Sequence, residues 1–172
     1  MSAMRRRAPS FRPAGRPGTP RWPFLFVAVA SFGAVAEALV SQHVYGMEPC
    51  PWCVLERLLF VAMGVFALLG LAWRRPSGAW LAATLVMLLA IAGFAATMWQ
   101  HLVAAKSASC NLTLADRIMT ASGLDQLLPG VFEARATCAD AAVTLAGIPY
   151  DFLAAVVFAA CAIATIRAVQ PR

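Results

Sequence analysis

The chain has 172 residues, of which 61% are hydrophobic and only 13% are charged. A soluble domain carries about a quarter charged residues and at most about half apolar residues, so this composition excludes an ordinary soluble fold. The net charge of +6 does not indicate a nucleic acid partner, because six of the fourteen Lys and Arg residues precede the first apolar run. A basic tail followed by an apolar run is typical of a membrane protein.

Residues 1–21 form a basic, Pro-rich tail, for which we expect disorder and a role in membrane orientation. Four apolar runs follow, each near the roughly 20 residues with which a helix crosses the hydrocarbon core. Continuous apolar runs of this length satisfy their backbone hydrogen bonds in lipid as helices. We therefore predict an all-α membrane protein with one domain at 22–172, a four-helix transmembrane bundle with helices at about 22–40, 53–73, 79–101 and 150–169.

The Lys and Arg residues outside these runs are unevenly distributed. The N-terminal tail, the Arg74-Arg75 turn and the C-terminal end hold ten of them, whereas the loops at about 41–52 and 102–149 hold three. The positive-inside rule then predicts cytoplasmic termini and two outward loops. In a bacterium this is a multi-pass protein of the inner membrane, embedded in the lipid bilayer, with both loops in the periplasm.

The first apolar run has an alternative interpretation as a signal peptide. An Arg-rich tail, an apolar core and the small residues Ala34 to Ala36 fit a cleaved secretory signal. The run continues past Ala36 to Val40, which favours a membrane helix. Cleavage would leave three helices and would not change which loops face outward.

Five cysteines divide unevenly over this topology. Cys50 and Cys53 lie in or beside the first outward loop, Cys110 and Cys138 lie in the second, and Cys161 lies within the fourth apolar run. Disulfides persist on the oxidising side of the membrane, so the four outward cysteines suit two bridges. We interpret Cys161 as a small packing residue.

Cys50 and Cys53 form a Cys-x-x-Cys pair, for which a redox role is the favoured interpretation. A bridge between them closes almost no loop and adds little stability. Zinc would require a second short-spaced pair, whereas 27 residues separate Cys110 from Cys138. Pro51 is a favoured first helical residue, so Cys53 falls in a first turn, where the helix dipole favours a thiolate. We expect Cys50, just outside the helix, to be more accessible to incoming thiols.

Arg57 lies four residues after Cys53, on the same helix face and one turn deeper. A charge within an apolar span is costly and indicates function by default. The alternative is an arginine that snorkels to the interface, only about 6 Å away by helical rise. Position alone leaves both interpretations open. Glu56 and Glu37 are candidate charge partners.

The string QHVYGMEPCPWCVLER, residues 42–57, resembles the DsbB family of bacterial disulfide bond formation proteins. The shared features are Gln-His-Val, Pro-Cys-x-x-Cys and an arginine four residues later, and the four-helix topology extends the resemblance over most of the chain. The resemblance implies a protein-disulfide:quinone oxidoreductase. Such an enzyme reoxidises a periplasmic DsbA-like thiol oxidase and passes the electrons to the membrane quinone pool, as ubiquinone or menaquinone.

The resemblance also implies a role for each cysteine of the two pairs. The partner's thiolate would attack Cys110 and release Cys138, which would attack Cys50 and leave Cys53 as the thiolate beside the quinone.

Two further residues gain roles in quinone binding from the resemblance. Arg57 would bind a quinone oxygen. His101, at the outward end of the third run, occupies the position of a family histidine near the quinone; from position alone it is an interfacial polar residue.

Other interpretations remain open beside this one. Residues 114–128 have apolar side chains at loosely helical spacing, which suits an amphipathic helix on the membrane surface or a polar loop with hydrophobic anchors.

For function, the chain is also similar to the vitamin K epoxide reductase family, although the Cys-x-x-Cys pair of that family sits late in the bundle. A non-catalytic membrane scaffold with two structural disulfides is the alternative from another class, and a metal-binding membrane protein is a weaker one. We predict no metal.

Overall fold

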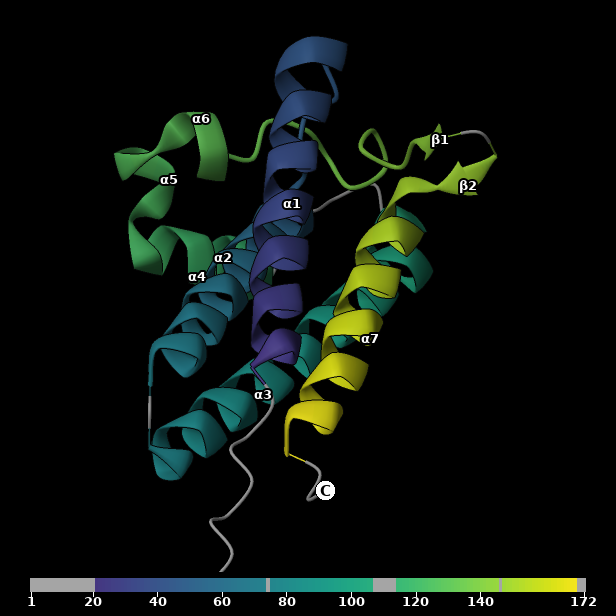
Figure 1. The fold of residues 1–172 in the computed structure, drawn as a ribbon. Coiled ribbons are helices and arrows are strands. Elements are labelled where there is room, and N and C mark those ends of the chain that lie inside the picture. The colour runs from purple at the N-terminus through teal and green to yellow at the C-terminus, as the bar shows by residue number, and fades with distance from the viewer. Residues whose placement is uncertain (1–20, 74, 107–113, 146, 170–172) are drawn as a thin grey trace, which may run out of the picture.

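Four long helices form a bundle, and short elements cover one end of it (Figure 1). The computed structural model describes residues 21–73, 75–106, 114–145 and 147–169. The long helices are α1 (Trp22–Tyr45), α2 (Pro51–Ala72), α3 (Pro76–Leu102) and α7 (Tyr150–Val169). The short elements are the 3-10 helix η1 (Ala104–Lys106), α4 (Leu114–Ser122), α5 (Leu124–Leu127), α6 (Pro129–Phe132), β1 (Thr144–Leu145) and β2 (Ile148–Pro149).

Proline and glycine set the ends of the first two helices. Pro51 is the first residue of α2, a position where its missing N–H costs no hydrogen bond. Gly46 ends α1 with φ of 67°, in the left-handed region that glycine adopts most easily. Helix α1 therefore continues five residues beyond the predicted end at 40, and the first loop shrinks to residues 46–50.

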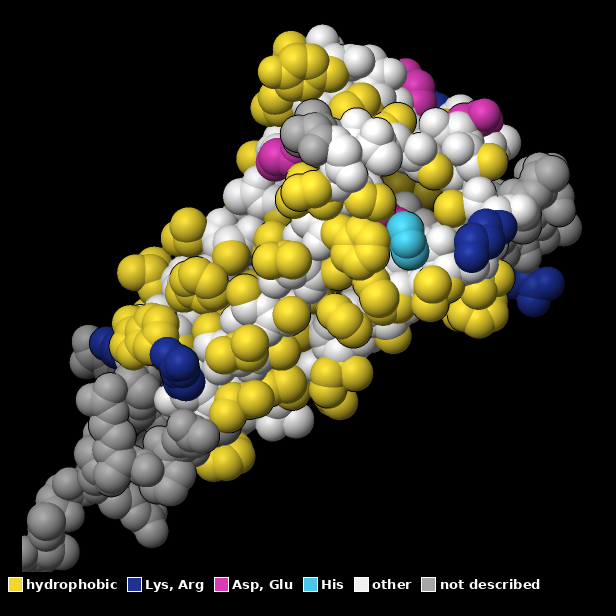
Figure 2. All heavy atoms as spheres, turned by 90° about the vertical axis from the view of Figure 1, so that its right-hand side faces the viewer, with side chains coloured by type: hydrophobic (Ala, Val, Ile, Leu, Met, Phe, Trp, Pro, Cys, Tyr) yellow, Lys and Arg dark blue, Asp and Glu magenta, His cyan; other side chains and the backbone are white. Residues whose placement is uncertain are grey.

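The four long helices pack as a ring, with α1 and α3 each against both α2 and α7. At the centre, the rings of Phe60 from α2 and Phe158 from α7 stack with their centroids 3.9 Å apart. Each long helix is long and apolar enough to cross a membrane. On the face shown in Figure 2, hydrophobic side chains cover most of the length of the bundle, and the visible Asp and Glu side chains gather toward one end. The prediction of four apolar helices of membrane-spanning length is confirmed among the described residues.

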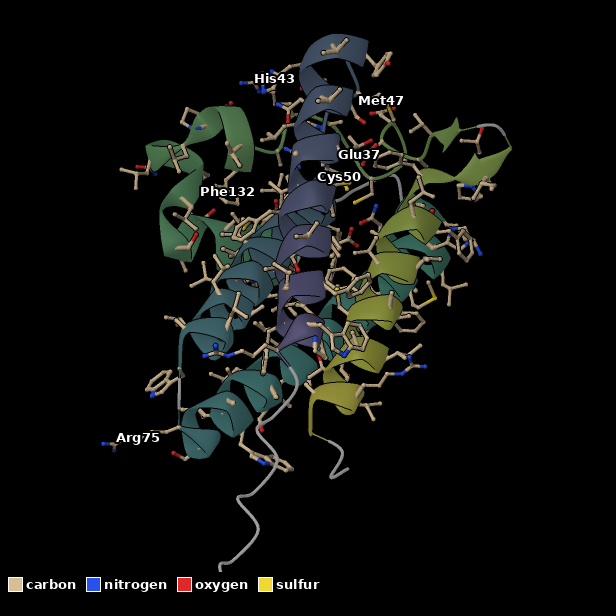
Figure 3. The ribbon with its side chains drawn as sticks, viewed as in Figure 1. Glu37, His43, Met47, Cys50, Arg75 and Phe132 are labelled. Atoms are coloured by element: carbon tan, nitrogen blue, oxygen red, sulfur yellow. The ribbon has the colours of Figure 1, made fainter. Side chains whose placement is uncertain are left out.

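The two ends of the bundle differ in what they carry. Helix α1 begins and α7 ends at the same end as Arg75, which Figure 3 labels. Residues 46–50 and the described parts of the segment from η1 to β2, which are residues 104–106, 114–145 and 147–149, lie toward the opposite end, which we call the loop end. Apart from Arg21, the predicted tail at 1–21 lies outside the described residues, and so does Cys110.

The segment predicted as either an amphipathic helix or a polar loop is helical over 114–122. Ala115 and Met119 are buried, and α4 packs against α2. Leu114 and Ile118 remain exposed. The antiparallel sheet of β1 and β2 was not predicted. Each strand has only two residues, which is too short to show an alternating pattern, and Gly147 (φ 83°) lies between the two strands.

Gly93 of α3 allows the buried Phe158 ring to approach the α3 backbone. A Cβ at position 93 would collide with that ring, whereas a Cβ at Gly33 of α1 would meet nothing within 4 Å. We expect Gly93→Ala to cost about 1–3 kcal/mol of stability through overpacking. Gly33→Ala is the matched control and should be neutral or stabilising. Thermal unfolding in detergent measures both; equal melting temperatures for the two variants would contradict this account of the packing.

Candidate functional site: a thiol pair beside a buried cavity

The Cys50–Cys53 pair sits at the first turn of α2. Cys50 is the N-cap residue, and its Sγ accepts a hydrogen bond from the Cys53 N–H at 3.3 Å. Both cysteines are free thiols, with their sulfur atoms 2.6 Å apart. Because a Cys-x-x-Cys at a helix start places both sulfurs on one side, the pair can close into a disulfide with little movement.

Our expectation that Cys50 is the more accessible thiol is wrong. Its side chain is 0% exposed, whereas Cys53 is partly exposed and lines a cavity. The cover comes from the long loop, because the N–H groups of Arg135 and Ala136 both donate to Pro49 O, at 2.9 and 3.2 Å. The chain between α6 and β1 is thereby fixed over the residue that precedes Cys50.

The second cysteine pair is described only in part. Cys138 is disulfide-bonded and buried, in the same hydrophobic cluster as Cys50. Its predicted redox partner, Cys110, lies outside the described residues. Cys161 is a free, buried thiol in the other cluster, among the membrane helices.

The burial of Cys50 predicts the order in which the reduced pair is alkylated. The contact with the Cys53 thiol, together with burial, raises the pKa of Cys50 above its ordinary value. A raised pKa leaves less thiolate at a given pH, so Cys50 should react slowly with iodoacetamide at pH 7 and faster as the pH rises toward 10. Tandem mass spectrometry of the 22–57 peptide separates the two positions, with the denatured protein as reference. Faster labelling of Cys50 than of Cys53 at pH 7 would contradict the geometry.

A cavity of about 880 Å³ opens beside Cys53. The volume is in the range of sites for small molecules and cofactors. Its deeper wall is apolar, and polar groups cluster near the thiol pair at the loop end, where Figure 3 labels Glu37 and Cys50. The apolar lining residues of α1, α2 and α7 include Gly33, Ala34, Phe60, Leu153, Ala154 and Val157.

Arg57 faces this cavity and joins three elements. Its Nη1 donates to Gln42 Oε1 at 2.6 Å and to Val131 O at 3.0 Å, and its Nη2 donates to Ala38 O at 3.2 Å. The side chain is 5% exposed, so the snorkelling interpretation is wrong: the guanidinium turns into the protein. Five N–H groups are available on a guanidinium, and these bonds use three of them.

Neither acidic residue that we named as a charge partner forms an ion pair with Arg57 within the described part of the chain. Glu37 instead accepts from Tyr150 OH at 2.6 Å and from Ser41 Oγ at 3.0 Å. These three residues line the cavity from α1 and α7. Sequence reasoning did not predict this role for Tyr150, because nothing in the local sequence links it to a residue more than a hundred positions away.

Glu56 points into the cavity one helical turn after Cys53. Its side chain is 6% exposed, and its Oε1 has no hydrogen-bond partner among the described residues. On α3, Gln100 Nε2 donates to Cys53 Sγ at 3.4 Å. Sequence reasoning predicted neither the place of Glu56 in the cavity nor the contact between Gln100 and Cys53. The place of Glu56 could have been predicted, because it lies three residues after Cys53 on the same helix face and because carboxyl groups within a membrane span are usually functional.

His101 does not line the cavity directly. Its Nδ1 lies 2.8 Å from Asp151 Oδ2, and its ring meets Phe152 edge-on. Asp151, at the start of α7, does line the cavity. The structure thus brings Cys50, Cys53 and Arg57 to one site. Among the described residues, His101 is connected to that site through Asp151, which we did not predict.

Comparison with known proteins places this site in context. A family model described as "Disulfide bond formation protein DsbB" matches residues 20–168. "Disulfide bond formation protein B" of Chromobacterium violaceum is 34% identical over 160 residues, covering 90% of this chain and 95% of that protein. The protein of the same name from Ralstonia nicotianae is 39% identical over 116 residues, covering 67% and 72%. "Disulfide bond formation protein B 1" of Pseudomonas aeruginosa is 32% identical over 132 residues, covering 74% and 80%.

Proposed function

This chain belongs to the DsbB family of disulfide bond formation proteins, and from that premise we propose that it is a protein-disulfide:quinone oxidoreductase. Family membership itself implies a disulfide-forming oxidoreductase. The proposal adds the route: electrons from a periplasmic DsbA-like thiol oxidase pass through two cysteine pairs to ubiquinone or menaquinone. It also adds the setting, the bacterial inner membrane with the loop end in the periplasm.

The observation that carries the proposal is a partly exposed thiol on the wall of a large, mostly apolar cavity within the membrane bundle. Cys53 lines the cavity together with Arg57, whose remaining N–H groups suit a ligand oxygen. An apolar wall with a few polar groups at one end fits a quinone, which has an apolar tail and a ring with two carbonyl oxygens. When bound, the quinone supplies a two-electron acceptor, which cysteines alone lack.

The two cysteine pairs are arranged for transfer toward this cavity. We propose that the partner's thiolate attacks Cys110, that Cys138 is released, and that Cys138 attacks Cys50 so that Cys53 leaves as a thiolate. Cys138 and Cys50 share one buried cluster beneath the loop that is fixed to Pro49.

Arg57 and Gln100 act on the thiol that faces the cavity. The Gln100 amide donates to Cys53 Sγ, and the Arg57 guanidinium places a positive charge one turn deeper on the same helix face. Both favour a thiolate at Cys53 over a thiol. Arg57 also offers N–H donors where negative charge develops on the acceptor oxygen.

The direct test is an assay with purified protein in detergent, a short-chain quinone and a reduced DsbA-like oxidase. Quinone absorbance should fall as the oxidase forms its disulfide, with one quinone consumed for each disulfide. A preparation that forms no quinol would refute the quinone step and leave the scaffold interpretation standing. Omission of the oxidase is the control, because quinone loss without a dithiol donor is not turnover.

A further inference from the structure

Protons and electrons must reach the acceptor by different routes in the proposed reaction. Thiol–disulfide exchange moves electron pairs as thiolates attack disulfides, so the partner's protons are lost to water at its own surface. Reduction of a quinone to a quinol consumes two protons at oxygens inside the cavity. The cavity therefore needs a proton donor of its own and a connection from that donor to water.

Glu56 has the properties of such a donor. It lines the cavity beside Cys53, it is almost fully buried, and its Oε1 lacks a hydrogen-bond partner among the described residues. An unpartnered carboxyl oxygen in an apolar span is energetically unfavourable, so its presence indicates a function. A carboxyl group that carries a proton and faces a cavity is able to donate it there.

A series of side chains leads from Glu56 toward the outside of the bundle. Asp151, at the start of α7, lines the same cavity as Glu56. Asp151 Oδ2 is 2.8 Å from His101 Nδ1, and the side chains of Asp151 and His101 are 13% and 34% exposed. Exposure thus rises stepwise from Glu56 through Asp151 to His101, as a path from cavity to water requires.

Charged and titratable groups surround Glu56 from three of the four long helices, and Glu48, Arg135 and Asp140 line the same cavity from the loops. Helix α3 faces it with the neutral side chains of Thr97 and Gln100. The titratable groups that line the same cavity from the long helices are Cys53 and Arg57 of α2, Glu37 of α1, and Tyr150 and Asp151 of α7.

We propose that Glu56 is a further catalytic residue, which donates a proton to an acceptor oxygen in the cavity and is reprotonated from water through Asp151 and His101. The inference rests on the proposed function. In this step the Cys50 thiol and the Cys53 thiolate form a disulfide and give up two electrons. The Cys50 S–H and the Glu56 carboxyl each lose one proton, so the acceptor gains two electrons and two protons and Glu56 becomes a carboxylate.

The test compares Glu56→Gln with Glu133→Gln, which removes an exposed carboxyl outside the cavity. We expect Glu56→Gln to lower kcat about 100-fold, in the range that general acids contribute, with little change in the quinone KM. Its rate should fall about tenfold for each unit of rising pH, because hydronium ion then supplies the proton, and small weak acids such as formate should restore it. Glu133→Gln should match the wild type.

Two further measurements separate this inference from the proposed function and from misfolding. Oxidised Glu56→Gln protein, without quinone, should still oxidise one equivalent of reduced DsbA-like oxidase, which shows that its cysteine pairs are intact. Glu56→Asp should recover part of the lost rate, and Asp151→Asn should slow turnover with formate rescue. A wild-type kcat and pH profile in Glu56→Gln would overturn the inference alone; absence of quinol from the wild type would overturn the function.

Discussion

Replacing Cys53 with alanine will reduce quinone turnover to the level without enzyme, a loss of at least about a thousandfold. Cys53 is the thiol of the pair that lines the cavity, whereas Cys50 lies beneath the long loop. Without Cys53 the pair forms no disulfide, and no thiolate faces the cavity. Quinone absorbance in the assay with reduced oxidase measures the loss.

Cys161→Ala is the matched control for this variant. Cys161 is also a free thiol of the helix bundle and is buried among apolar side chains, but it does not line the cavity. Its replacement should leave the turnover rate unchanged and lower only the melting temperature, through the small cavity left behind. Full turnover by Cys53→Ala would contradict the relay, and it would favour a structural role for the Cys50–Cys53 pair.

The features that sequence reasoning predicted are those that depend on local residues. Apolar runs of membrane length give helices wherever they fall, because lipid leaves the backbone no other partner. Pro51 fixes the start of α2, so the position of Cys53 in the first turn could be predicted from residues 51–53 alone. The end of α1 was placed too early, because Ser41 and Gln42 are polar residues that the bundle buries.

The features that sequence reasoning missed depend on contacts between distant segments. The cover over Cys50 consists of backbone bonds from Arg135 and Ala136 to Pro49, and irregular chain has no periodicity that would reveal them. Tyr150 and Asp151 enter the cavity because α7 packs against both α1 and α3. Only an arrangement of all four helices shows which side chains meet.

The second large effect is expected from substitution of Arg57, the residue whose position alone left two interpretations open. We expect Arg57→Ala to raise the apparent quinone KM about 10- to 100-fold, or roughly 1.4–2.8 kcal/mol of binding free energy. That loss matches one hydrogen bond from a charged donor. Steady-state kinetics at saturating reduced oxidase measure it, and Arg167→Ala, an exposed arginine of α7, is the control.

Arg57 also joins α1 and α6 to α2, so its binding role must be separated from a structural one. Arg57→Lys retains the charge but not the forked donors, and should raise the KM less than alanine does. Gln42→Ala removes a partner of Arg57 without removing the charge. If Arg57 only held the helices together, Gln42→Ala and Arg57→Ala would lower the melting temperature and kcat together at constant KM. A binding role requires the KM to change in Arg57→Ala while Gln42→Ala leaves it near the wild-type value, because only the guanidinium reaches the cavity with N–H groups to spare.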